Sequence, residues 1–145
     1  MSEEVMFDIR NLTKKFGNNT ILKDINGQVK KGEVICIMGP SGAGKSTFLR
    51  CLNQLEKPTS GTVSVEGTEL TGLNEKGVQK VREKMGMVFQ NFNLFPNKTV
   101  LENVMLAPKK VKNVSDEEAK NNAQKLLDEV GMGAKAEAYP ASLSG

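Results

Sequence analysis

The chain contains no histidine among its 145 residues. Ser-His-Asp and Cys-His catalysis are therefore excluded within it, and a zinc site is not expected. Its two cysteines, Cys36 and Cys51, form no Cys-x-x-Cys pair, and both lie in apolar stretches of sequence. We expect them to be buried thiols in a reducing compartment.

Long apolar runs, blocks of one charge, repeats and low-complexity segments are also missing. The longest aliphatic run, residues 34–38, is far too short to span a membrane. The net charge is only +3 and the basic residues are mixed with acidic ones and not gathered into a block, so no nucleic-acid partner is expected. The N-terminus is acidic where a signal peptide would be basic, which predicts a cytosolic protein or one held at a membrane by a partner.

Strand patterns dominate the first ninety or so residues. The continuous apolar, β-branched run at residues 34–38 predicts a strand buried on both faces of a parallel sheet. Alternation and turn residues predict further strands at residues 5–9, around 21–22, at 62–65 before a Glu66-Gly67 turn, and at 86–89.

Helical patterns dominate the last fifty residues. Capping boxes of Thr99 with Glu102 and Ser115 with Glu118 predict two helix starts. The first helix should stop at Pro108 and the second at Gly131. Two earlier helices are expected, an amphipathic one with Phe48, Cys51, Leu52 and Leu55 that Pro58 and Gly61 end, and one at residues 78–84. The apolar stripe of the last helix comprises Ala119, Ala123, Leu126, Leu127 and Val130.

A glycine-rich motif follows the run at residues 34–38 and fits G-x-x-x-x-G-K-[ST]. Glycines allow a backbone to approach a polyphosphate closely and to adopt unusual dihedral angles. The next helix turns its N-terminus toward the phosphates, Lys45 should reach the β- and γ-phosphates, and Ser46 should ligate Mg²⁺. The motif therefore predicts a site for ATP with Mg²⁺, formed by Gly39, Pro40, Ser41, Gly42, Ala43, Gly44, Lys45, Ser46 and Thr47.

The glycine-rich motif at residues 39–47, called a P-loop, occurs in several kinds of protein, and other segments distinguish among them. These segments lie at residues 58–61, 87–90, 94–96, 99–103 and 143–145. In these segments the chain resembles the ATP-binding subunits of ABC transporters along its whole length. Residues 49–53, 89–96, 106–108 and 138–144 are typical of the branch that imports polar amino acids into bacteria.

The resemblance assigns roles to single residues. It implies that Phe16 stacks on adenine, that Ile21 flanks the base, and that Gln90 reaches Mg²⁺ and the attacking water. Lys45 and Gln90 would be catalytic, and Ser46 and Gln90 would hold the metal. Without the resemblance, Phe16 would be interpreted as an aromatic residue of the core or of a sheet edge, and Gln90 as a polar residue at the end of a strand. The loop at residues 91–97, with apolar Phe92, Leu94 and Phe95, would meet a transmembrane permease.

The chain ends where the signature motif of such proteins begins. Leu143, Ser144 and Gly145 would serve the nucleotide of a second copy in a homodimer. We therefore expect an α/β P-loop NTPase of the ABC ATPase type, with an N-terminal antiparallel β subdomain at residues 1–90 and the start of a helical subdomain at residues 91–145. The C-terminal half of the core would be missing, and with it the acids needed for efficient hydrolysis.

The function implied is ATP binding and, in the intact protein, hydrolysis that energises amino-acid import. The partners would be permease subunits, a second ATPase subunit and, indirectly, a substrate-binding protein, with the chain peripheral on the cytoplasmic face of the membrane. A soluble ABC-type ATPase without a transport role is the alternative, although such proteins usually carry insertions or tandem domains. A small P-loop kinase would need an Arg-rich lid, which residues 87–96 do not supply.

Overall fold

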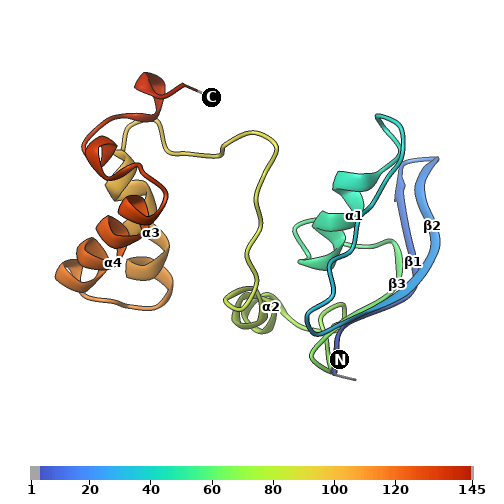
Figure 1. Ribbon diagram of the computed structural model, residues 1–145. Coiled ribbons are helices and arrows are strands. Elements are labelled where there is room, and N and C mark those ends of the chain that lie inside the picture. Colours follow the sequence, from blue (N-terminus) through green and yellow to red (C-terminus); the bar gives the residue numbers. More distant parts are fainter. Residues whose placement is uncertain (1–3, 145) are drawn as a thin grey trace. The chain divides into compact units, whose positions relative to one another are not determined.

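A computed structural model describes residues 4–144 of the chain. The chain divides between Gly86 and Met87 into two compact units (Figure 1). Among the described residues, the first unit contains an antiparallel sheet and two helices, and the second contains helices and coil but no strand.

The sheet of the first unit has four strands in the order β2-β1-β3-β4, and every pair is antiparallel. They are β1 (Val5–Phe16), β2 (Asn19–Lys30), β3 (Ser60–Val65) and β4 (Thr68–Glu69). Glu66 and Gly67, with φ of 49° and 78°, form the predicted turn between β3 and β4. Positive φ at both central residues matches the twist of a tight hairpin. The antiparallel N-terminal sheet is confirmed, and its first two strands are longer than predicted.

Helix α1 (Lys45–Leu52) lies against this sheet (Figure 1). Its Cys51 is fully buried in the core that it shares with the strands. Leu55 lies beyond the end of the helix and is about half exposed, so the predicted apolar stripe is one residue too long. The buried core of the unit comprises Ile9, Leu12, Leu22, Cys51, Val63, Val65 and Leu70.

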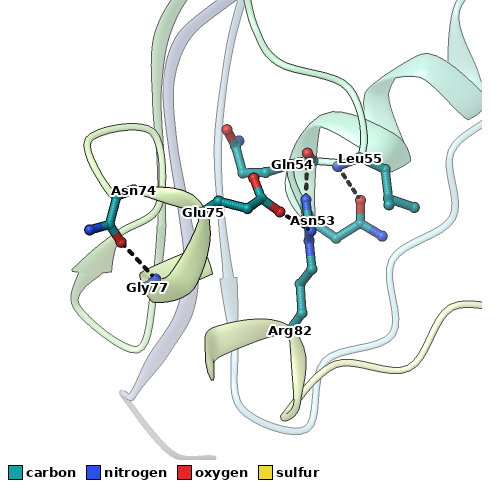
Figure 2. Close-up of polar contacts among 7 residues, drawn as sticks. All are labelled: Asn53, Gln54, Leu55, Asn74, Glu75, Gly77 and Arg82. Carbon is teal, nitrogen blue, oxygen red and sulfur yellow. Dashed lines mark hydrogen bonds and ion pairs between the residues drawn. The ribbon is translucent and has the colours of Figure 1, made fainter. Parts of the chain in front are cut away.

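Helix α2 (Glu75–Arg82) is held to the end of α1 by Arg82 (Figure 2). Its Nε donates a hydrogen bond to the carbonyl of Asn53 at 2.7 Å, and Nη2 donates to the carbonyl of Gln54 at 2.6 Å. Nη1 donates to Glu75 Oε1 at 3.0 Å. Carbonyls at the C-terminal end of a helix lack donors within the helix and carry partial negative charge, so a guanidinium satisfies them well.

The run at residues 34–38 is not a strand in the structure. Val34 and Met38 are 90% and 91% exposed, and no described segment pairs with the run. A strand exists only where a neighbour accepts and donates its backbone hydrogen bonds. The prediction of a buried parallel strand is therefore wrong for this chain. The short strand predicted at residues 86–89 is likewise coil, with Val88 almost fully exposed.

The second unit consists of α3 (Val100–Val111), α4 (Asp116–Glu129) and two short 3₁₀ helices, η1 (Gly133–Lys135) and η2 (Pro140–Ser142). The first capping box is confirmed in both directions. Thr99 Oγ1 accepts a hydrogen bond from Glu102 N at 3.2 Å, and Glu102 Oε2 accepts one from Thr99 N at 2.8 Å. Ser115 caps α4 by accepting from Glu118 N at 3.3 Å.

Two details of the helical predictions are wrong. Helix α3 continues past Pro108, whose carbonyl accepts a hydrogen bond from Lys112 N at 3.2 Å. Proline loses only its own donor and keeps its acceptor, so a helix near its end can pass it. On α4, Ala119, Ala123 and Leu127 are buried as predicted, but Leu126 and Val130 are exposed.

Candidate nucleotide-binding site

The loop at residues 39–44 leads directly into α1. Gly42 and Gly44 have φ of 79° and 91°, in the left-handed region that glycine adopts without strain. Gly44 is also the N-cap of α1. A Cβ on Gly44 would lie 2.7 Å from Ile21 Cγ2, so both the dihedral angle and the close approach require glycine there.

Gly39 differs from the other two glycines of the motif. Its φ lies outside the left-handed region, and a Cβ there would lie 3.4 Å from Ala43 Cβ, close to ordinary contact. The left-handed dihedral angles that glycine permits are therefore used at Gly42 and Gly44, whereas Gly39 does not use them. The loop is closed by a hydrogen bond from Ala43 N to the Pro40 carbonyl at 3.2 Å.

Lys45 folds its ammonium group back onto this loop. Its Nζ donates to the carbonyls of Gly39 and Pro40, both at 2.6 Å. The positive charge thus lies against the loop that it follows in sequence. A phosphate oxygen would be a stronger acceptor for it than a neutral carbonyl, because both partners of that bond are charged.

The first turn of α1 is suited to bind an anion. Gly44 has no side chain to cap the turn, and the turn contains no acidic residue. Backbone N–H groups at such a helix start carry partial positive charge. Ser46 is exposed in this turn and Thr47 is half-buried beside it. Ser41 is exposed on the loop.

The β1–β2 hairpin carries two further predicted residues, and one of them, Ile21, lies beside the loop. Ile21 on β2 contacts Gly44 closely, as the 2.7 Å approach of its Cγ2 shows. Phe16 ends β1, pairs with Asn19 at the start of β2, and is 48% exposed. The loop at residues 39–44, α1 and the β1–β2 hairpin thus belong to the same compact unit, and Ile21 is a contact between the hairpin and the loop.

Sequence reasoning missed one residue of this arrangement, Lys14. Its Nζ lies 4.7 Å from the centroid of the Phe16 ring. The spacing of Lys14 and Phe16 could have indicated this contact, because residues i and i+2 of a strand face the same side of a sheet.

An apolar groove of about 650 Å³ lies beside the loop in the first unit. It is lined by side chains of β2, of α1 and of residues 33–38, among them Leu22, Ile25, Ile37 and Leu49. Cys36 lines it and is exposed, so the prediction that both cysteines are buried is wrong for Cys36. Cys51 is buried as predicted, and burial raises the pKa of its thiol.

The remaining predicted residues lie in the second unit. Gln90 is exposed in a coil near the start of that unit, and its catalytic and metal-binding roles stay predictions. Leu143 packs on the core of Val100, Leu101, Ala123, Leu127 and Ala136, and Ser144 is exposed. Gly145 lies outside the described residues.

No cluster of three or more Cys, Asp or Glu side chains among residues 4–144 could hold a metal ion. Nor does that part of the chain contain a helix with the length and apolarity needed to cross a membrane.

Comparison with known proteins assigns the chain to a family. The chain is 51% identical over 140 residues to the arginine transport ATP-binding protein ArtM of Bacillus subtilis (strain 168), covering 97% of this chain and 58% of that protein. It is 49% identical to the glutamine transport ATP-binding protein GlnQ of the same organism, covering 97% of this chain and 57% of that one. The chain thus spans less than two thirds of the length of these relatives.

Solved structures agree with the sequence relatives. The dimeric post-hydrolysis structure of the ATP-binding cassette MJ0796 bound to ADP and Pi matches with a TM-score of 0.85 at 39% identity, over 96% of this chain and 63% of that one. The family described as ABC transporter matches residues 22–145, which is most of the chain. The fold is therefore that of an ABC ATPase, and the chain belongs to the ABC transporter family.

Proposed function

We propose that this chain binds ATP at residues 39–47 as part of the ATPase subunit of an importer for polar amino acids. The observation that carries the proposal is the geometry of Gly44 and Lys45. A left-handed glycine opens α1 without a side-chain cap, and the adjacent ammonium lies over the loop. The relatives named above include transport proteins for arginine and glutamine, which supports the substrate class.

Each part of the site would hold a different part of ATP. The loop and the first turn of α1 bind the phosphates, Lys45 exchanges its two carbonyl acceptors for phosphate oxygens, and Phe16 stacks on adenine with Ile21 beside the base. Mg²⁺ commonly takes one or two protein ligands and fills its other positions with phosphate oxygens and water. The exposed hydroxyl of Ser46 fits one such ligand, and Gln90 would supply another. The bound ion would neutralise phosphate charge.

A membrane partner is supported by the loop at residues 91–97. Phe92 is 76% exposed, and Leu94 and Phe95 are about half exposed. Asn103 holds this loop in place, because its side chain accepts a hydrogen bond from Phe95 N at 2.8 Å and donates one to the Phe95 carbonyl at 3.1 Å. Apolar side chains held rigidly at a surface are typical of a protein interface. We propose that a permease subunit covers them at the cytoplasmic face of the membrane.

In the intact protein, two such subunits would enclose ATP between them. Ser144 and Gly145 of one copy would then face the nucleotide of the other, and a substrate-binding protein would deliver the amino acid to the permease. Hydrolysis and transport are proposed for the whole protein, because the chain spans 58% of the length of ArtM.

Titration of a fluorescent ATP analogue tests nucleotide binding. Lys45→Met should weaken the affinity at least about tenfold, because a charge-assisted contact to phosphate is lost. Lys120→Met removes the same charge from an exposed position on α4 and should leave the affinity unchanged. Equal affinities of the wild-type chain and Lys45→Met, with both folded, would refute the site. Co-purification with a permease encoded beside this gene tests the transport role.

A further inference from the structure

We propose that Lys14 is a positioning residue that holds the Phe16 ring ready for the adenine base. The inference rests on the proposed function, since it concerns the base-binding part of the same site. The Nζ atom of Lys14 lies 4.7 Å from the centroid of the Phe16 ring. This distance is within the range in which a cation is attracted to the π face of an aromatic ring.

The ammonium of Lys14 is itself fixed. It forms an ion pair with Glu56 Oε1 at 2.5 Å and donates a hydrogen bond to the Lys57 carbonyl at 2.8 Å. Only 11% of the Lys14 side chain is exposed. A shielded cation interacts more strongly with a ring than one in bulk water, because solvent screens it less.

These contacts tie the ring to the C-terminal end of α1. Glu56 and Lys57 follow α1, and Glu56 N donates to the Arg50 carbonyl of that helix at 3.0 Å. Lys14 thus connects the end of the β1–β2 hairpin to the helix that begins at Lys45.

Two consequences follow for the base. The cation occupies one face of the ring, so the other face is left for stacking, and the 48% exposure of Phe16 fits a ring covered on one side. A ring already ordered also loses less side-chain freedom when the nucleotide binds. Lys14 therefore contributes to recognition of the base and not to recognition of the phosphates.

The test compares two ligands, ATP and inorganic tripolyphosphate, which lacks the base. In Lys14→Met the dissociation constant of ATP should rise about three- to tenfold, as expected for a shielded cation–π contact, while that of tripolyphosphate should stay within a factor of about two. Lys14→Arg retains a cation and should recover most of the ATP affinity. Lys15→Met, an exposed neighbour with the same charge change, should behave as wild type with both ligands.

The outcomes separate this inference from the proposed function. If the wild-type chain binds neither ligand, the ATP site is wrong and the inference falls with it. If wild type binds both but Lys14→Met keeps its ATP affinity, or weakens for both ligands equally, only the role of Lys14 is overturned. Thermal unfolding followed by circular dichroism accompanies each titration. If Lys14→Met is folded and the ratio of its two affinities equals that of the wild type, the inference is overturned. A role in base recognition requires that ratio to change, whereas general structural damage would weaken both ligands alike.

Discussion

Arg82 Nη2 donates a hydrogen bond of 2.6 Å to the carbonyl of Gln54, just beyond the end of α1. Together with the 2.7 Å bond to Asn53, this contact holds α2 on the helix that carries the nucleotide-binding loop. Hydrogen bonds to a charged donor contribute about 1.5–3 kcal/mol each when they are shielded. The Arg82 side chain is 26% exposed, which places these two bonds near the lower end of that range.

Arg82→Leu should therefore lower the free energy of unfolding by about 3 kcal/mol, because two carbonyls each lose a charged donor. Urea denaturation measures the change. Glu75→Gln removes only the exposed partner of Arg82 and should cost less than about 1 kcal/mol. Lys80→Met is a matched control on the exposed side of α2. Equal stabilities of Arg82→Leu and the control would show that the contact does not stabilise the unit.

Gly44→Ala should both destabilise the chain and weaken nucleotide binding. The alanine would have to adopt the φ of 91° that Gly44 has, which is unfavourable for a residue with a Cβ, and its methyl group would lie 2.7 Å from Ile21 Cγ2. Backbone strain of this kind costs about 1–3 kcal/mol. Thermal unfolding and titration with a fluorescent ATP analogue give the two readouts.

Gly39→Ala is the internal control for that change. Gly39 lies outside the left-handed region and its nearest neighbour would be 3.4 Å away, so the stability should change little. If Gly44→Ala were as stable as Gly39→Ala, the conformation assigned to the start of α1 would be wrong.

The two cysteines should differ in reactivity. Cys36 is exposed, whereas Cys51 is fully buried and burial raises the pKa of its thiol. Because the thiolate is the reacting species, a raised pKa slows alkylation at a given pH, and burial slows it further by limiting access. N-ethylmaleimide at about pH 7.5, where a part of an exposed thiol is ionised, should label Cys36 first. Peptide mass spectrometry identifies the site. Labelling of Cys51 at the same rate in the folded chain would contradict the packing of α1.

Local patterns predicted much of the secondary structure. The Glu66-Gly67 turn and the cap of α3 by Thr99 and Glu102 are confirmed, because each depends on residues within one turn of the chain. The P-loop motif also identified the start of α1. The stripe on α4 was predicted less well, since periodicity cannot say how wide a face its neighbours cover, and Leu126 is exposed.

The amino-acid sequence alone determined the family, the phosphate-binding motif and the starts of α1, α3 and α4, whereas α2 begins at Glu75, three residues before the predicted start. These depend on residue types at short, fixed spacings, where backbone geometry leaves few alternatives. Tertiary structure decided which apolar segments are covered, and it placed Lys14 over Phe16 between β1 and the end of α1. The run at residues 34–38 illustrates the difference, because its sequence pattern is typical of a buried strand but Val34 and Met38 are exposed in the structure. Burial and strand pairing need a partner segment, and a partner is a property of the folded chain and not of the segment itself.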